Sequence, residues 1–197
     1  HLNIIRKLQP DLIIANKEEN VKEQVEELAR EFPVHTTDIA NLHDALQMIK
    51  DIGAMTARQE KALQIADKIH DQFSQLHKEI TVTIPTAYLI WKDPYMTVGG
   101  DTFISDMLTR CGFENVFASE TRYPAISLSQ LQTANCQVFL LSSEPYPFKA
   151  NHMAELKLEL PGKKIMLADG EMFSWYGSRL LQAPAYFRQL RKMVYNT

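Results

Sequence analysis

The chain has 197 residues, 45% of them hydrophobic, and a formal net charge of −3 at pH 7. A folded chain of this length buries about 70% of its unfolded surface, so a hydrophobic core is expected. The weak net charge argues against nucleic acid as a partner, and no apolar run approaches the ~18 residues of a membrane span. Two cysteines are too few for a disulfide scaffold; Cys111 and Cys136 have the option of pairing, but we expect two separate buried thiols.

Residues 1–55 predict an incomplete α/β lobe. The apolar run at 11–15 is typical of a buried parallel strand, and 34–37 predicts a second strand. Between them, Asn20 and Glu23 have the spacing of a capping box at the start of a helix. A two-stranded sheet is marginal alone. We therefore expect that further opening elements of this lobe have been removed or never existed, as the first residue, His1, also suggests.

Residues 56–79 predict one long backbone helix between this lobe and a second one at 80–197. Neither Pro nor Gly interrupts the helix, and its apolar side chains recur at helical spacing. Thr56 and Gln59 form its expected capping box, and Asn41 caps the shorter helix before it. At about 1.5 Å per residue the rod is about 33 Å long, enough to connect two lobes.

The second lobe repeats the design of the first. Strands are predicted at 86–91, 138–141 and 164–168, and a final helix over 178–195. Asp101 is the expected cap of one helix between them, and Ser127 with Gln130 forms the expected capping box of another. Residues 7–18 are similar to residues 130–144, and each segment leads through a helix to a further strand. Two equivalent α/β units are one interpretation, and the ordinary repetition of any α/β protein is the other.

Several segments carry a resemblance to a known family. They are Leu8-Gln-Pro-Asp-Leu-Ile-Ile-Ala15, Val98-Gly-Gly-Asp-Thr-Phe-Ile-Ser-Asp-Met-Leu108, Cys111-Gly-Phe-Glu-Asn-Val-Phe117, Tyr123-Pro, Ser143-Glu-Pro-Tyr-Pro-Phe148 and Asp169-Gly. In this order around a long helix, the chain resembles the periplasmic substrate-binding proteins with a helical backbone that feed ABC importers, in their vitamin B12- and ferric-chelate-binding branch.

This resemblance implies two Rossmann-like lobes joined by the long helix, with a ligand cleft between them and a further strand and helix before residue 1. It implies a periplasmic or lipid-anchored protein that captures a corrinoid, haem or ferric siderophore and delivers it to an ABC permease. It implies no catalysis and no resident cofactor, because the transported ligand itself would carry the metal.

The expected ligand contacts follow the carboxyl ends of the strands, where open α/β sheets bind ligands. Aromatic and methionine side chains are frequent there and suit the faces of a corrin or porphyrin, although several of them would equally fill the core. The resemblance implies that Asn16 and Met172 replace aromatic ligand contacts of the B12-binding relative, which argues against a strict B12 assignment. It also implies that His35 lies near another aromatic position of the cleft. The candidates are Asn16, His35, Trp91, Tyr95, Met96, Tyr123, Tyr146, Phe148, Met172, Phe173, Trp175 and Tyr176.

Two alternatives remain open. A bare Zn²⁺ or Mn²⁺ site needs about four N or O ligands, and only His35, His152 and Asp169 are expected to come together in a cleft. An α/β enzyme or interaction domain is the other alternative. It is disfavoured because Gly99-Gly100 lacks the lysine of a phosphate-binding loop and no nucleophile elbow is present.

Four carboxylates are candidates for docking on the permease. The resemblance implies one surface glutamate per lobe that pairs with permease arginines. Glutamate at a helix start is also favoured by the helix dipole alone. The candidates are Glu18, Glu19 and Glu23 in the first lobe and Glu144 at the equivalent place in the second.

Overall fold

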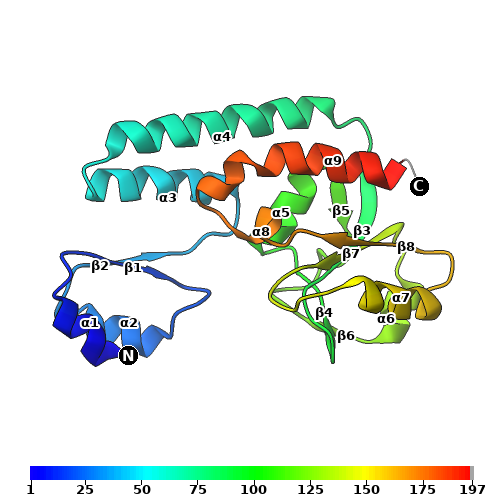
Figure 1. The fold of residues 1–197 in the computed structure, drawn as a ribbon, viewed down its shortest axis with the longest axis horizontal. Helices are drawn as coiled ribbons and strands as arrows, with labels where there is room; N and C mark the ends of the chain where they lie inside the picture. Colours follow the sequence, from blue (N-terminus) through cyan, green and yellow to red (C-terminus); the bar gives the residue numbers. More distant parts are fainter. Residues whose placement is uncertain (196–197) are drawn as a thin grey trace. The chain divides into compact units, whose positions relative to one another are not determined.

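The computed structural model describes residues 1–195 and separates into a first unit, residues 1–39, and a second unit from residue 40 onward (Figure 1). Both units combine parallel strands with helices, which confirms the predicted α/β class. Within the described residues, no helix has the length and hydrophobicity that a bilayer crossing requires.

The first unit is a strand–helix–strand motif preceded by one helix. Its elements are α1 (Leu2–Leu8), β1 (Ile13–Asn16), α2 (Lys22–Leu28) and β2 (Val34–Thr37). The two strands are parallel and in register from Ile13 opposite Val34 to the strand ends. Arg6 of α1 forms ion pairs with Glu27 at 2.6 Å and Glu31 at 2.7 Å, and these bonds tie α1 to the segment of α2.

The second unit is built on a four-stranded parallel sheet of order β5-β3-β7-β8, with a separate antiparallel pair of β4 and β6. Its elements in chain order are α3 (Leu42–Met55), α4 (Gln59–Glu79), β3 (Ile84–Leu89), β4 (Tyr95–Met96), α5 (Phe103–Arg110), β5 (Phe113–Asn115), β6 (Ala125–Ile126), α6 (Leu128–Thr133), β7 (Val138–Ser142), α7 (Ala150–Glu159), β8 (Lys164–Ala168), α8 (Glu171–Ser174), the 3-10 helix η1 (Ser178–Leu181) and α9 (Ala183–Tyr195).

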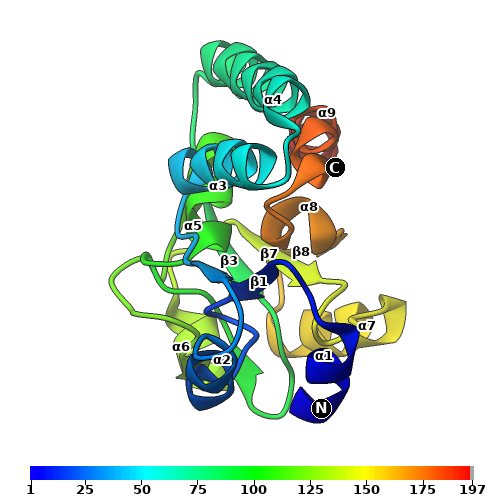
Figure 2. The ribbon, with the colours of Figure 1, turned by 90° about the vertical axis from the view of Figure 1, so that its left-hand side faces the viewer.

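Helices cover both faces of this sheet. Helices α6 and α7 lie on one face, and α5, α8 and α9 lie on the other (Figure 1 and Figure 2). Alternate side chains of β7 point to opposite faces of the sheet. Phe139 and Leu141 pack against α6 and α7, as expected for a strand buried on both faces. On the opposite side, a chain of ring contacts links Tyr88 through Phe173 to Phe187.

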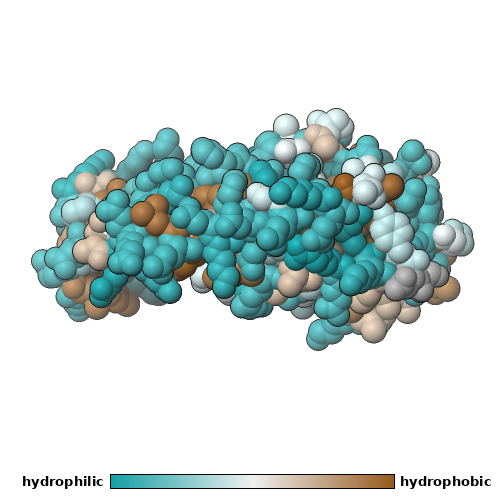
Figure 3. All heavy atoms as spheres, turned by 90° about the horizontal axis from the view of Figure 1, so that it is seen from above, coloured by the Kyte–Doolittle hydropathy of each residue, from teal (hydrophilic) through white to brown (hydrophobic). Residues whose placement is uncertain are grey.

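The long helix is present as predicted. Helix α4 has 21 residues without a break, and its buried stripe consists of Ala62, Ala66, Ile69, Phe73 and Leu76. It packs against α3 and α9, and the surface seen from above these helices in the second unit is mainly hydrophilic (Figure 3). Helix α3 therefore groups with α4 in the second unit, whereas the sequence pattern predicts that residues 1–55 belong to the first lobe. The division into ligand-binding lobes stays a prediction.

Three predicted helix caps are wrong. Asn20 does not cap α2, because its side-chain oxygen accepts the Asn16 N–H instead. The hydroxyl of Thr56 donates to the Ile52 carbonyl at the end of α3 rather than starting α4. Thr102, not Asp101, caps α5.

Two other caps are confirmed. The Asn41 side chain accepts the Asp44 N–H at 3.1 Å, and Ser127 with Gln130 forms the expected capping box of α6. Cys111 and Cys136 are separate buried thiols, as predicted.

Candidate functional site

The parallel sheet of the second unit brings three strand ends together. Strands β3, β7 and β8 are neighbours, with Leu89 opposite Leu141 and Ser142 opposite Ala168. The segments that follow these ends begin at residues 90, 143 and 169, and they therefore leave the same edge of the sheet. This edge is where open α/β sheets bind ligands.

An aromatic cluster forms at the ends of β3 and β7, and we call Trp91, Tyr146, Phe148 and His152 the Trp91 cluster. The Trp91 and Tyr146 ring centroids lie 5.5 Å apart, and those of Tyr146 and Phe148 lie 4.7 Å apart. Trp91 is 40% exposed, whereas Phe148 is buried beneath the cluster. The structure thus brings together three of the predicted ligand contacts, of which Trp91 is exposed and Tyr146 is half-buried. Phe148 belongs to the hydrophobic core, so its burial does not fit a direct contact with a ligand.

His152 belongs to the same cluster, although its ring nitrogens are both engaged. Its Nδ1 accepts the Lys149 backbone N–H at 3.0 Å, so the neutral ring carries its proton on Nε2. That nitrogen lies 3.4 Å from the Tyr146 hydroxyl. His152 therefore fixes the start of α7 and one side of Tyr146.

Two further predicted contacts flank Trp91 on the short β4 strand. Met96 forms a β-bridge with Trp91, and both Tyr95 and Met96 are half-buried. Desolvation raises the pKa of the Tyr95 hydroxyl above its usual range. Tyr123, just before β6, is also half-buried and lies with its ring centroid 5.4 Å from the guanidinium carbon of Arg122.

A second exposed indole follows β8. Trp175 is 51% exposed, and its Nε1–H donates to Glu144 Oε1 at 2.9 Å. The next residue, Tyr176, packs its ring against Phe103 at 5.3 Å between centroids. Glu144 itself is half-buried and is engaged with its own unit.

Two candidates of the same segment are core residues. Phe173 is fully buried, with ring contacts of 4.9 Å to Tyr88 and 4.8 Å to Phe187. Met172 is 8% exposed. Both belong to the one-turn helix α8, which turns these side chains towards the sheet, so the expectation that they face a ligand does not fit their burial.

In the first unit, Asn16 ends β1 and organises the turn that follows. Its Oδ1 accepts the Glu18 N–H at 2.6 Å, and its own N–H donates to Asn20 Oδ1 at 2.8 Å. Glu19, in this turn, and Glu23, in the first turn of α2, are exposed. His35 lies inside β2 opposite Ile14, two residues before the strand ends. It is therefore not at the carboxyl end of the strand, where ligand contacts are expected.

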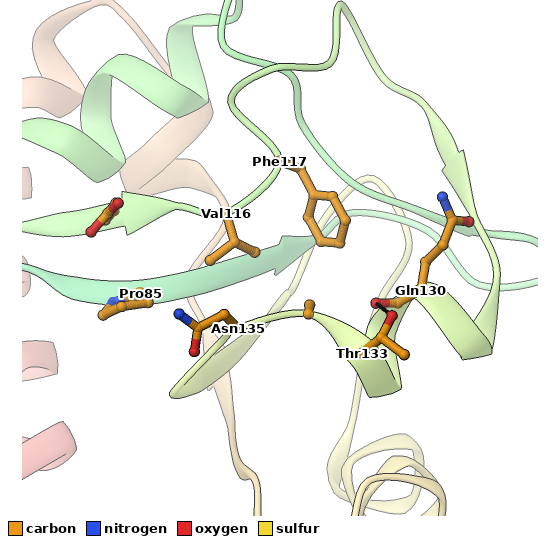
Figure 4. Close-up of a pocket in the computed structure, with 8 residues that line it drawn as sticks. Pro85, Val116, Phe117, Gln130, Thr133 and Asn135 are labelled. Atoms are coloured by element: carbon orange, nitrogen blue, oxygen red, sulfur yellow. Dashed lines mark hydrogen bonds between the residues drawn. The ribbon is translucent and has the colours of Figure 1, made fainter.

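A pocket of about 490 Å³ opens elsewhere in the second unit, and no motif in the sequence predicts it. Phe117 and Val116, from the segment after β5, lie across from Thr133 and Asn135 at the end of α6 (Figure 4). None of the predicted ligand contacts lines it. The chief signal for it in the sequence was the run Val116-Phe117 after a short strand, which is equally typical of core.

Within residues 1–195, no three His, Cys, Asp or Glu side chains are grouped so as to hold a metal ion. Asp169 lies 4.0 Å from Arg179, which also pairs with Glu171. The residues weighed for a bare metal ion in the second unit are thus engaged with neighbouring side chains.

Comparison with known proteins identifies the protein family. The sequence profile of the family described as periplasmic binding protein matches residues 2–158, and the chain belongs to this family. It is 28% identical over 159 residues to the vitamin B12-binding protein of Vibrio parahaemolyticus, which covers 78% of this chain and 57% of that protein. The chain thus spans little more than half the length of this relative.

Solved structures agree on the fold. The periplasmic vitamin B12 binding protein BtuF of Vibrio cholerae is similar with a TM-score of 0.82 at 21% identity, over 100% of this chain and 79% of that one. The periplasmic heme-binding protein RhuT from Roseiflexus sp. RS-1, in apo form, has a TM-score of 0.81 at 19% identity, over 99% and 79%. The resemblance seen in the sequence is therefore confirmed, and the family is one of binding proteins, not enzymes, with a location in the periplasm or at the cell envelope.

Proposed function

We propose that this chain is the substrate-binding component of an ABC importer and captures a metal chelate (a corrinoid, haem or ferric siderophore) for delivery to a membrane permease. The observation that carries the proposal is the Trp91 cluster at the ends of β3 and β7 in a member of the periplasmic binding protein family. The names of similar proteins, which bind vitamin B12 or haem, support the same ligand class.

The Trp91 cluster suits a large flat ligand for a physical reason. Tyr146 is held by ring contacts with Phe148 and His152, so it loses little rotamer freedom when a ligand stacks nearby. Aromatic rings bury a large area and accept offset or edge contacts with another π-system. Affinity in this proposal comes from a preformed surface, and no chemistry is required of the protein.

The proposed partner for delivery is the permease, on which the chain would dock through surface carboxylates. Glu19, in the turn after β1, and Glu23, in the first turn of α2, are exposed, as a docking group must be. Glu18 is half-buried in the same turn. The proposed inter-lobe cleft and this docking role rest on the family resemblance.

Titration of the intact chain with cyanocobalamin, haemin and ferrichrome, followed by isothermal calorimetry, tests the proposal. We expect one of these chelates to bind with one-to-one stoichiometry, and Trp91→Ala and Tyr146→Ala each to weaken that binding about tenfold or more, because central aromatic contacts dominate binding energy.

Phe117→Ala is the matched control, because it removes an aromatic ring from the pocket in Figure 4 and leaves the strand ends intact. A loss of affinity in Phe117→Ala alone would indicate that the chelate binds in that pocket. Absence of binding by all three chelates would contradict the proposed ligand class.

A further inference from the structure

Glu144 connects two strand ends through its carboxylate. It follows β7 by two residues, and its Oε1 accepts two hydrogen bonds from the segment after β8. The Ser174 hydroxyl donates at 2.5 Å and the Trp175 indole N–H donates at 2.9 Å. One oxygen of a half-buried carboxylate thus holds the end of α8 and the exposed indole beside it.

The path of the Glu144 side chain is itself fixed. The Ser142 hydroxyl donates to the Glu144 carbonyl at 2.6 Å, which sets the backbone at the start of the segment. The side chain then passes over Gly170, where an added Cβ would lie 2.5 Å from Glu144 Cγ and 2.5 Å from Ser142 Oγ. Gly170 has φ −61°, so close approach, not an unusual backbone angle, is what requires glycine here.

The Trp175 indole is 51% exposed, so packing restrains only the covered part of the ring. Its N–H is its single hydrogen-bond donor, and what this donor needs from its partner is an acceptor oxygen at this place. The bond to Glu144 therefore supplies the restraint that packing does not.

We propose that Glu144 is a positioning residue that holds the Trp175 indole in the orientation in which it contacts the bound chelate. This inference rests on the proposed function for the identity of the ligand. It differs from the docking role expected from the sequence in what it requires: positioning needs an acceptor oxygen at this place, whereas pairing with a permease arginine needs a negative charge.

Time-resolved fluorescence anisotropy tests the positioning without any ligand. The background variant Trp91→Phe leaves Trp175 as the one tryptophan of the chain, and Glu144→Ala, Glu144→Gln and the exposed control Glu159→Ala are compared in it. We expect Glu144→Ala to raise the amplitude of fast indole motion. Glu144→Gln keeps an acceptor oxygen, so it and Glu159→Ala should match the background. Unchanged motion in Glu144→Ala overturns the proposal.

Gly170→Ala gives a second route that leaves the carboxylate in the sequence. The new Cβ would meet both Glu144 Cγ and the Ser142 hydroxyl that anchors the Glu144 backbone. Either clash displaces the carboxylate, so we expect the same gain in indole motion as in Glu144→Ala. Circular dichroism of each variant verifies that it is folded. A folded Gly170→Ala with a rigid indole also counts against the proposal.

Chelate binding then connects positioning with function. In the chain that retains Trp91, we expect Glu144→Ala to weaken the binding of cyanocobalamin or haemin about tenfold, and Glu144→Gln to leave it unchanged. An equal loss in both variants overturns the positioning role, because charge would then be the requirement. If the wild-type chain binds neither probe, the proposed function fails for these ligands, while the anisotropy result still decides the positioning.

Discussion

The two cysteines have become part of the hydrophobic core. The Cys111 thiol donates to the Leu108 carbonyl, and the Cys136 thiol donates to the Val138 carbonyl at 2.9 Å. Burial raises the pKa of Cys111 well above its usual range and raises the pKa of Cys136 to about 11. The thiolate, which is the reactive form, is therefore scarce in the folded protein.

Alkylation with iodoacetamide at pH 8 should be slow for both thiols. A rise of the Cys136 pKa from 9.0 to about 11 lowers its thiolate fraction by about 100-fold, and the effect on Cys111 is larger. Mass spectrometry of the protein labelled in buffer and in concentrated urea measures the two rates. Equal rates in both solutions would show that the thiols are accessible in the folded chain.

At the scale of single elements, the start of α5 shows why a cap is hard to assign from sequence. Asp101 and Thr102 are both good N-cap residues and stand side by side. The Thr102 hydroxyl accepts the Ser105 N–H at 3.2 Å and donates to the Gly99 carbonyl at 2.8 Å. Asp101 is instead engaged by the Arg122 N–H at 2.6 Å, a partner 21 residues away. That distant contact, absent from any local pattern, decides the cap.

Thr102→Ala should lower the free energy of unfolding by about 1 to 2 kcal/mol, because it removes a cap and leaves buried backbone groups without a partner. Urea denaturation followed by circular dichroism measures the change. The control is Thr121→Ala, an exposed threonine for which a change within about 0.5 kcal/mol is expected. Equal stability of the two variants would show that Thr102 does not carry the cap.

At the scale of the whole molecule, the sequence predicted the α/β class but not the short strands β4, β5 and β6. The strand–helix–strand motifs β1–α2–β2 and β7–α7–β8 were predicted from hydrophobic periodicity, as was the long helix α4. This periodicity is a local property of the sequence. Burial at the site is not local. Phe173 and Trp175 are two residues apart, yet one is fully buried and the other is 51% exposed. The orientation of the one-turn helix α8 separates them, and tertiary packing sets that orientation.

The buried ionisable groups also govern how stability depends on pH. Burial raises the pKa of Tyr88 and Tyr186 as well as that of the two thiols. The Tyr88 hydroxyl donates to Ser142 at 3.0 Å within the core. All four groups are neutral when protonated, so the folded chain keeps these protons to higher pH than the unfolded chain does.

The sign of the effect follows from proton linkage. Above about pH 9 the unfolded chain releases these protons first, so it binds fewer protons than the folded chain and stability falls as pH rises. Each group that has ionised only in the unfolded chain lowers the free energy of unfolding by about 1.4 kcal/mol per pH unit. The contribution of Cys136 is fully present below about pH 9 and is lost as the pH approaches its folded value of about 11.

Urea midpoints measured from neutral pH to pH 10.5 should therefore decrease steeply above pH 9. Cys136→Ala removes one titrating group and should make the decrease shallower, although the variant starts from a lower stability because it leaves a small cavity. The change of the urea midpoint with pH is compared, not the midpoint itself, because a packing defect shifts all midpoints equally. An unchanged slope in Cys136→Ala, or midpoints independent of pH, would show that these groups are already exposed to solvent in the folded protein.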